Sequence, residues 1–289
     1  MSRVVITPAN VADIAKLPDG TKAYLEGDFP TYRGPKKTWD KGIILDCSKA
    51  TLNGWYWTKT AGVAFLNPTL REMRFPGLRL DDCQRITVTG ARAESTSIKF
   101  VRCEEVVVEG CVITRAGTGV SLSECSGISV VRNAFRLSTS DGVQCAGCDA
   151  FLISGNTFDG TERPGSQHPD AIQFWSLPGR VTRNGRIIGN RVLGNCQGIT
   201  SFDAAKGGIE DVLIADNDIC IGPDFKWGIA MQNARRVVLR DNILRTMPGS
   251  KTKVDIDDRG LDGKWKTSGI IYEGRNTLDG KLIEPTKAA

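Results

Sequence analysis

Short alternations of inward and outward positions recur along most of this chain. Each starts with an apolar residue, continues with a polar or small residue and turns inward again, as expected of a strand with one buried face. The first series comprises residues 78–80, 98–100, 120–122, 143–145, 172–174, 199–201 and 229–231. A second strand follows at residues 86–88, 106–108, 128–130, 151–153, 212–214 and 237–239. This recurrence predicts a repeat protein in which each coil contributes strands to stacked sheets.

Two columns of residues accompany these strands. Asparagines follow the second strands at a fixed offset, and cysteines lie between the two strands. The asparagines are Asn133, Asn156, Asn217 and Asn242, with Asn190 in a less regular coil, and the cysteines are Cys83, Cys103, Cys125 and Cys148. Asparagine tolerates the left-handed backbone of a sharp turn, and its amide can bond to the same residue one coil away. We therefore predict an asparagine ladder, with Cys111 at the ladder position of an earlier coil, and a buried column of thiols.

Small residues and insertions mark the boundaries of the coils. Gly119, Gly142, Ala171, Gly198 and Gly228 directly precede first strands, and this predicts tight corners. Successive first strands begin 20 residues apart in the early coils (78 to 98) and 41 apart at the end (229 to 270). Because insertions at one corner of a solenoid map to one face, the longer loops are expected to form a wall beside one sheet.

The N-terminal segment predicts a helix before the first coil. Thr7 and Pro8 suit the cap and first position of a helix over residues 9–17, in which Val11, Ile14 and Leu17 share one face. Such a helix would cover the open end of the stack. We therefore expect one structural domain, with a cap and first coil in residues 1–42, a solenoid in residues 43–276 and a tail in residues 277–289.

The ladder, the thiol column and the coil length together resemble the right-handed parallel β-helix proteins of the pectate-lyase-like superfamily, over roughly residues 42–276. Within it, the chain looks most like the tailspikes of phages and prophages and like polysaccharide depolymerases. The resemblance implies an all-β fold, a single-stranded right-handed parallel β-helix with an N-terminal helical cap. It is weak for activity, because this solenoid hosts lyases, hydrolases, epimerases and tailspikes, so function must be argued from the site.

Composition narrows the partners. The formal charge is only +5, and lysine and arginine are spread along the chain, so nucleic acid is not expected, whereas an acidic polysaccharide remains an option. The nine cysteines fit no zinc pattern, so neither a metal nor a cofactor is predicted. No apolar run approaches the roughly 20 residues that span a bilayer. The first residues do not resemble a signal peptide, so classical export is not expected.

Candidate chemistry centres on two aspartates. Asp141 precedes Val143 by two residues and Asp170 precedes Ile172 by two, so both share one register on neighbouring coils, about 4.8 Å apart. Like charges this close drive two pKa values apart and supply an acid and a base for glycosidic cleavage. His168, the sole histidine, is the candidate that orients Asp170 or acts as a base. The alternative is that the aspartates are turn residues and the histidine an ordinary loop residue.

Polar and aromatic residues flank this pair and are the candidates for sugar binding. The aspartate register continues through Gln197 and Trp227, and the outward strand positions beside it include Gln144, Gln173 and Thr200. Trp175 and Lys226 complete the candidate set. Aromatic rings stack on the apolar faces of sugars, and lysines attract acidic groups. A solvated strand face with rings that pack loops onto the solenoid is the alternative.

Residues 139–142 and Asp170 resemble part of the polygalacturonase pattern. In that family an Asn-Thr-Asp-Gly coil precedes an Asp-Asp pair, then Gly-His-Gly and Arg-x-Lys elements. Here Pro169 replaces the first aspartate of the pair, Gln197 stands at the histidine position, and residues 228–231 lack the basic side chains. The resemblance therefore carries over to Asp141 and Asp170 alone.

For function, the resemblance implies a tailspike-like virion protein that binds and depolymerises a bacterial surface polysaccharide. Such a protein is made in the host cytoplasm and becomes extracellular on lysis, which agrees with the expected lack of a signal peptide. A homotrimer or attachment to other virion proteins is the expected assembly. The alternatives are a non-catalytic structural or receptor-binding component of a phage particle, and a free polysaccharide lyase or hydrolase.

Overall fold

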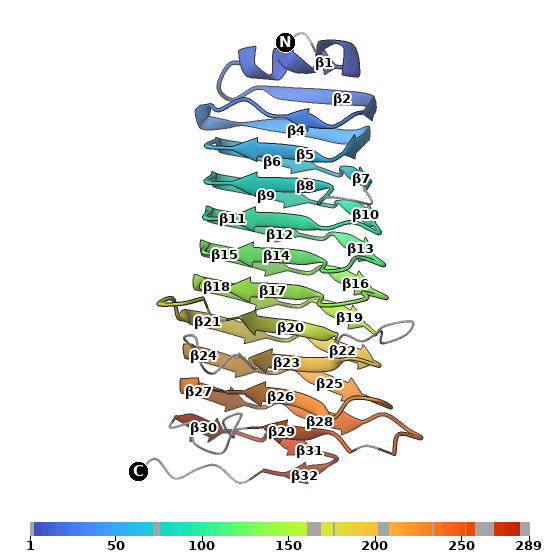
Figure 1. The fold of residues 1–289 in the computed structure, drawn as a ribbon, viewed down its shortest axis with the longest axis vertical. Coiled ribbons are helices and arrows are strands. Elements are labelled where there is room, and N and C mark those ends of the chain that lie inside the picture. Colours follow the sequence, from blue (N-terminus) through green and yellow to red (C-terminus); the bar gives the residue numbers. More distant parts are fainter. Residues whose placement is uncertain are drawn as a thin grey trace.

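A computed structural model describes residues 3–71, 76–160, 169–175, 177–201, 208–232, 234–251, 253–257 and 269–283. In these parts the chain forms a parallel β-solenoid, whose coils stack along the long axis from the N-terminal to the C-terminal end (Figure 1). Neighbouring coils pair their strands in parallel, in one sheet of 22 strands and another of 10 strands. The prediction of an all-β parallel solenoid is confirmed. One short helix is present in the described chain.

The ten-stranded sheet contains the first strand of each coil. Its members are β3 (Tyr32–Arg33), β5 (Trp55–Thr58), β8 (Leu78–Asp81), β11 (Ile98–Val101), β14 (Val120–Ser123), β17 (Val143–Ala146), β20 (Asp170–Trp175), β23 (Gln197–Ser201), β26 (Trp227–Met231) and β29 (Asp255–Asp257). Inward residues of these strands, such as Ile98 and Phe100, are fully buried.

The 22-stranded sheet contains the other strands of each coil. Second strands are β6 (Ala61–Leu66), β9 (Gln84–Thr89), β12 (Glu104–Glu109), β15 (Ser126–Val131), β18 (Asp149–Ser154), β21 (Thr182–Ile188), β24 (Ile209–Ala215), β27 (Ala234–Arg240) and β30 (Ile270–Glu273). Third strands are β7 (Thr69–Arg71), β10 (Arg92–Glu94), β13 (Val112–Thr114), β16 (Ala134–Arg136), β19 (Thr157–Asp159), β22 (Arg191–Gly194), β25 (Asp218–Ile221), β28 (Ile243–Thr246) and β31 (Thr277–Leu278). The terminal coils add β1 (Val4–Ile6), β2 (Lys22–Phe29), β4 (Thr38–Asn53) and β32 (Lys281–Leu282).

The third strand of each coil is a feature that the sequence did not reveal. These strands are short, and β13, for example, buries only its central Ile113 between two half-buried residues. Three residues with one inward side chain give no alternation to detect. The asparagines therefore lie at the corner between the second and third strands.

The asparagine ladder is confirmed and reaches Asn276. Asn156 shows the pattern: its Nδ2 donates to Oδ1 of Asn190 at 3.0 Å and to the carbonyl of Val130 at 2.9 Å. Its own Oδ1 accepts from the backbone amide and Nδ2 of Asn133 at 2.9 and 3.0 Å. Cys111 takes the ladder position one coil earlier, where its amide donates to Oδ1 of Asn133 at 2.9 Å. Each buried amide thus satisfies polar groups of two coils.

The thiol column is also confirmed. Cys83, Cys103, Cys125 and Cys148 are all buried and free. The backbone amides of Cys83 and Cys103 each lie 3.4 Å from the sulfur of the next cysteine in the column. These side chains act as small interior fillers between the sheets.

The glycines before the first strands are needed for a different reason than the predicted tight corner. The backbone of Gly198 does not adopt the left-handed φ that favours glycine; instead, a Cβ there would lie 2.0 Å from the carbonyl oxygen of Gly228 in the next coil. At Gly142 a Cβ would lie 2.7 Å from the carbonyl oxygen of Ala171. Close approach of neighbouring coils therefore selects glycine here.

We expect Gly198→Ala to lower the free energy of unfolding by about 3 kcal/mol, because the two coils must move apart to admit a methyl group. Urea unfolding followed by circular dichroism measures the change. Gly117→Ala is the matched control, since a Cβ there meets nothing within 4 Å. Equal stabilities of the two variants would contradict the close-approach explanation.

The segment predicted as an N-terminal helix is a 3-10 helix, η1 (Pro8–Lys16). It lies beside β1 and β2 at the end of the stack (Figure 1). Pro8 occupies its start as predicted, and the amide of Thr7 donates to the side-chain oxygen of Asn10 at 2.7 Å. The backbone of Asn10 departs from helical geometry and kinks the segment. Ile14 and Leu17 are buried, as their shared face predicted, whereas Val11 is partly buried.

Candidate functional site

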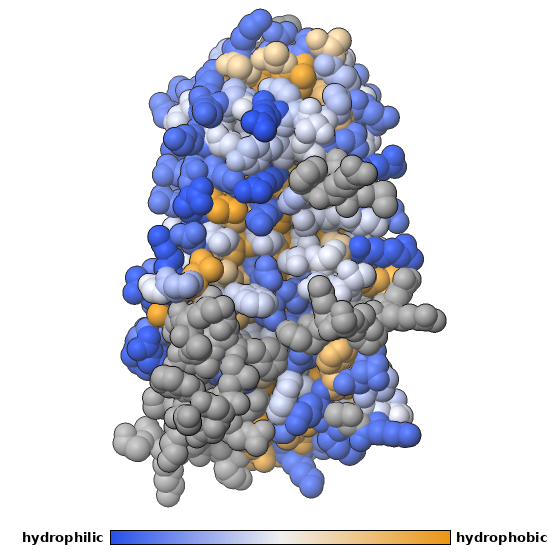
Figure 2. Space-filling view, in the orientation of Figure 1, coloured by the Kyte–Doolittle hydropathy of each residue, from blue (hydrophilic) through white to orange (hydrophobic). Residues whose placement is uncertain are grey.

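One row of outward side chains runs along the ten-stranded sheet. Strand pairing places its members in one register from coil to coil. In order along the stack they are Arg33, Tyr56, Arg79, Lys99, Ser121, Gln144, Gln173 and Thr200. The row is cationic and aromatic at its N-terminal end and neutral and polar further along. Figure 2 shows the molecule in the orientation of Figure 1, with hydrophobic residues in small patches among hydrophilic ones.

Asp141 and Asp170 lie side by side on neighbouring coils beside this row. The amide of Gly142 donates to the carbonyl oxygen of Asp170 at 2.8 Å, which fixes the register of the two aspartates. The backbone amide of Asp170 also lies 3.4 Å from Oδ1 of Asp141. Their exposed fractions are only 2% and 1%. The sequence therefore predicted their proximity, but it gave no indication of their burial.

Side chains of the polar row hold both carboxylates. Nε2 of Gln144 donates to Oδ2 of Asp141 at 3.1 Å, and Nε2 of Gln173 donates to Oδ2 of Asp170 at 2.9 Å. The hydroxyl of Thr200 donates to Oδ1 of Asp170 at 2.9 Å. Gln173 and Thr200 are buried with the aspartates, although outward strand positions were expected to face solvent. Hydrogen bonds to the carboxylates compensate the loss of their contact with water.

The other predicted binding residues surround this network. The indole N–H of Trp175 donates to Oε1 of Gln173, and 42% of Trp175 is exposed. Gln197 pairs with Asp170 across β20 and β23, and it is buried with no hydrogen-bond partner for its Oε1 in the described chain. Trp227 is half-buried one coil further on, with the ammonium group of Lys226 3.9 Å from its ring centre. His168 lies outside the described residues.

A small cavity of about 20 Å³ adjoins Asp170, and its lining was not predicted from the sequence. Ser138, Ser140, Asp159 and Cys196 contribute to it. This volume exceeds the roughly 15 Å³ that one water molecule requires. Burial, followed by the carboxylates of Asp170 and Asp159, raises the pKa of the Cys196 thiol to about 12, so this sulfur is not a nucleophile at neutral pH. These residues come from three coils, so no local motif identifies them.

Comparison with solved structures defines the class of fold. The Dettilon tailspike protein superposes with a TM-score of 0.62 at 11% identity, covering 94% of this chain and 62% of that one. A surface adhesin of Streptococcus pneumoniae gives 0.58 at 11% identity, covering 94% and 81%, and an alginate lyase from a Paenibacillus species gives 0.57 at 12%, covering 88% and 99%. The chain spans 62% of the length of the Dettilon tailspike and 56% of the length of the tailspike of E. coli bacteriophage HK620. At these identities the likeness establishes the fold.

The sequence also places the chain in a family. Residues 53–220 match the family described as periplasmic copper-binding protein (NosD), and the chain belongs to it. No curated protein matches the sequence significantly. Within the described residues, no helix is long and apolar enough to cross a bilayer.

The described residues do not fit a copper site. Copper in proteins is bound by imidazole, thiolate and thioether groups that converge on one point. In the described part of the chain, no three histidine, cysteine, aspartate or glutamate side chains gather in this way. Eight of the nine free cysteines are buried, and those of the interior column lie beside backbone carbonyls. No chemistry of this chain is therefore derived through copper.

Proposed function

We propose that this chain binds a bacterial surface polysaccharide along the ten-stranded sheet. The observation that carries the proposal is the continuous row of outward side chains from Arg33 to Gln144, which lies in one register across six strands. Strands in a sheet repeat every 4.8 Å or so, and the row therefore offers a polymer a regular series of contacts. Amide and hydroxyl groups pair with sugar hydroxyls, and the exposed ring of Trp175 suits the apolar face of a sugar.

The similar structures support a glycan ligand by analogy, because they include tailspikes, an adhesin and an alginate lyase. We propose a tailspike-like role in a virion, in which the protein is released on lysis and attaches to sister copies as a trimer or to other virion proteins.

We also propose that the solenoid is right-handed and that η1 caps its end. In this proposal the whole chain is one domain, in which residues 1–42 and 277–289 flank the central solenoid of residues 43–276.

Retention of polysaccharides tests the binding proposal. We expect at least one member of a panel of acidic and neutral bacterial surface polysaccharides to be retained by the immobilised protein. Trp175→Ala should weaken that retention at least tenfold, because stacking on an exposed ring contributes about 1.5 kcal/mol. Leu193→Ala is the matched control, since Leu193 is 39% exposed on the other sheet. Retention of no polysaccharide, or equal loss in both variants, would contradict binding at this face.

Cleavage of the bound polysaccharide is a second candidate, and the pairing of two carboxylates favours it. Asp141 and Asp170 occupy neighbouring coils, whose strands lie about 4.8 Å apart. The carboxyl groups of retaining glycosidases are separated by a similar distance of roughly 5 Å. In this proposal one aspartate is the acid and the other the nucleophile, with His168 as the supporting residue. Gln144, Trp175, Lys226 and Trp227 contact the sugars in this proposal, while the buried Gln173, Gln197 and Thr200 lie beside Asp170 and help to position it. Polysaccharide binding does not depend on this second step.

A further inference from the structure

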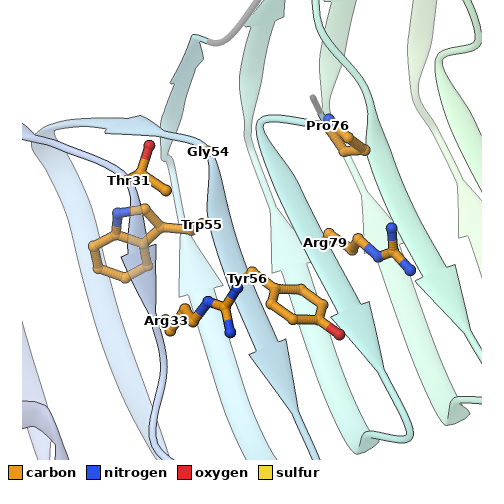
Figure 3. A pocket seen from close by; sticks show the side chains of 7 residues that line it. All are labelled: Thr31, Arg33, Gly54, Trp55, Tyr56, Pro76 and Arg79. Atoms are coloured by element: carbon orange, nitrogen blue, oxygen red, sulfur yellow. The ribbon is translucent and has the colours of Figure 1, made fainter. Parts of the chain in front are cut away.

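A pocket of about 320 Å³ opens on the N-terminal part of the ten-stranded sheet, away from the aspartates. Side chains of β3, β5 and β8 line it, and Figure 3 shows them. Trp55 is fully buried and lies near Thr31, and Arg33, Tyr56 and Arg79 line the rest of the pocket together with Gly54 and Pro76. The volume lies at the lower end of the range for small-molecule sites, which suits a single sugar residue.

Strand register places Tyr56 between the two arginines. Arg33 pairs with Tyr56 across β3 and β5, and Tyr56 pairs with Arg79 across β5 and β8. The guanidinium carbons of Arg33 and Arg79 lie 5.9 and 5.4 Å from the centre of the tyrosine ring. Figure 3 shows the phenol ring flanked by both arginines. Cation–π contacts on both sides therefore hold the ring in place.

The charges at this pocket favour an anion. Nε and Nη2 of Arg79 donate to Oδ1 and Oδ2 of Asp81 at 3.0 and 2.8 Å, and the hydroxyl of Tyr56 donates to Oδ2 of Asp81 at 2.9 Å. Asp81 thus balances the charge of Arg79, and the guanidinium group of Arg33 adds a positive charge to the pocket. Within the described chain no carboxylate pairs with Arg33, so its planar fork is available to a ligand carboxylate.

The pocket and the aspartates lie on one line. From Arg79 the row continues through Lys99, Ser121 and Gln144 to Gln173, each on the next strand. These four strand spacings amount to about 19 Å. A linear glycan that lies on the row passes over both places, and the ammonium group of Lys99 keeps the intervening step cationic.

We propose that this pocket binds an acidic sugar residue of the polysaccharide, a uronate whose carboxylate meets Arg33 and whose ring fills the pocket beside Tyr56. The inference rests on the proposed polysaccharide binding and specifies its substrate class. The volume of the pocket selects a ring and Arg33 selects a carboxylate, so a ligand with both groups binds more tightly than a ligand with one.

The test is a titration of the full chain with glucuronate, glucose and acetate, followed through the side-chain indole N–H signals in NMR spectra. We expect the dissociation constant for glucuronate to be at least tenfold lower than those for glucose and for acetate. Arg33→Gln should weaken glucuronate binding at least tenfold. Arg186→Gln is the matched control, because Arg186 is exposed on β21 of the other sheet, and it should leave binding unchanged.

The outcomes separate this pocket from the proposed function. Equal affinities for glucuronate and acetate would indicate a plain anion site and overturn the proposal, as would undiminished binding in Arg33→Gln. Polysaccharide retention without glucuronate binding would refute the pocket and leave the function intact. Glucuronate binding with no polysaccharide retained would instead contradict the function, while the preference of the pocket for the acidic sugar would stand.

Discussion

Replacing Asn156 by leucine is expected to lower the free energy of unfolding by about 4 kcal/mol. Asn156 is fully buried, and its amide satisfies groups in two other coils. Without it, the backbone amide and Nδ2 of Asn133 lose their acceptor, and the carbonyl of Val130 and Oδ1 of Asn190 lose a donor. Each unsatisfied buried group costs about 1–3 kcal/mol, and the costs are not additive. Reversible urea unfolding, monitored by far-ultraviolet circular dichroism, measures the loss.

A surface amide provides the control for that experiment. Gln84 is exposed, and its Nε2 donates to Glu104 at 3.1 Å. Gln84→Ala removes an amide of similar chemistry from the surface and should change stability by no more than about 0.5 kcal/mol. A cost for Asn156→Leu as small as that of Gln84→Ala would mean that the ladder does not hold the coils together.

Asp170→Asn is expected to lower the release of oligosaccharides from a retained polysaccharide by about 1,000-fold, if the carboxylate acts as acid or nucleophile. The substitution keeps the shape of the side chain and one acceptor oxygen, which can still accept from Gln173 or from Thr200, the side-chain donors in the described part of the chain. Retention of the polysaccharide should therefore stay within about twofold of the wild type, because binding depends on the row and not on this carboxylate. Reducing-end assays and mass spectrometry of the products measure the change.

The cleavage proposal needs a control for charge alone. Asp28 is exposed on β2, far along the chain from the site, and Asp28→Asn should leave release unchanged. A wild-type protein that retains the polysaccharide and yields no new reducing ends would remove Asp141, Asp170 and His168 from any catalytic role. Polysaccharide binding would then be the whole function.

The sequence predicted those features of the fold that repeat from coil to coil. Asn133 and Asn156 recur at a fixed distance from their strands, so the ladder could be read before the structure was known. Asp141 and Asp170 likewise lie two residues before Val143 and Ile172, which pair with each other, so the sequence placed the two aspartates side by side. Registers are readable in this way because parallel pairing converts equal offsets along the chain into neighbours in space.

Features without a repeat were not readable. Asn10 kinks η1 because its backbone leaves the helical region, and no periodicity encodes that departure. Thr200 occupies an outward strand position, yet it is buried because its hydroxyl bonds to Asp170. Two residues of the pocket, Arg33 and Tyr56, lie before residues 78–80, where the recognisable series of first strands begins, so they could be aligned with Arg79 only through the observed pairing of β3, β5 and β8.

A crystal structure of the protein with a fragment of a retained polysaccharide tests the central claim most directly. We predict that the glycan lies on the ten-stranded sheet along the row from Arg33 to Gln173, with a carboxylate of the sugar within hydrogen-bonding distance of Arg33. A glycan bound on the 22-stranded sheet would contradict this account. So would a glycan that runs parallel to the strands and contacts the row at a single coil.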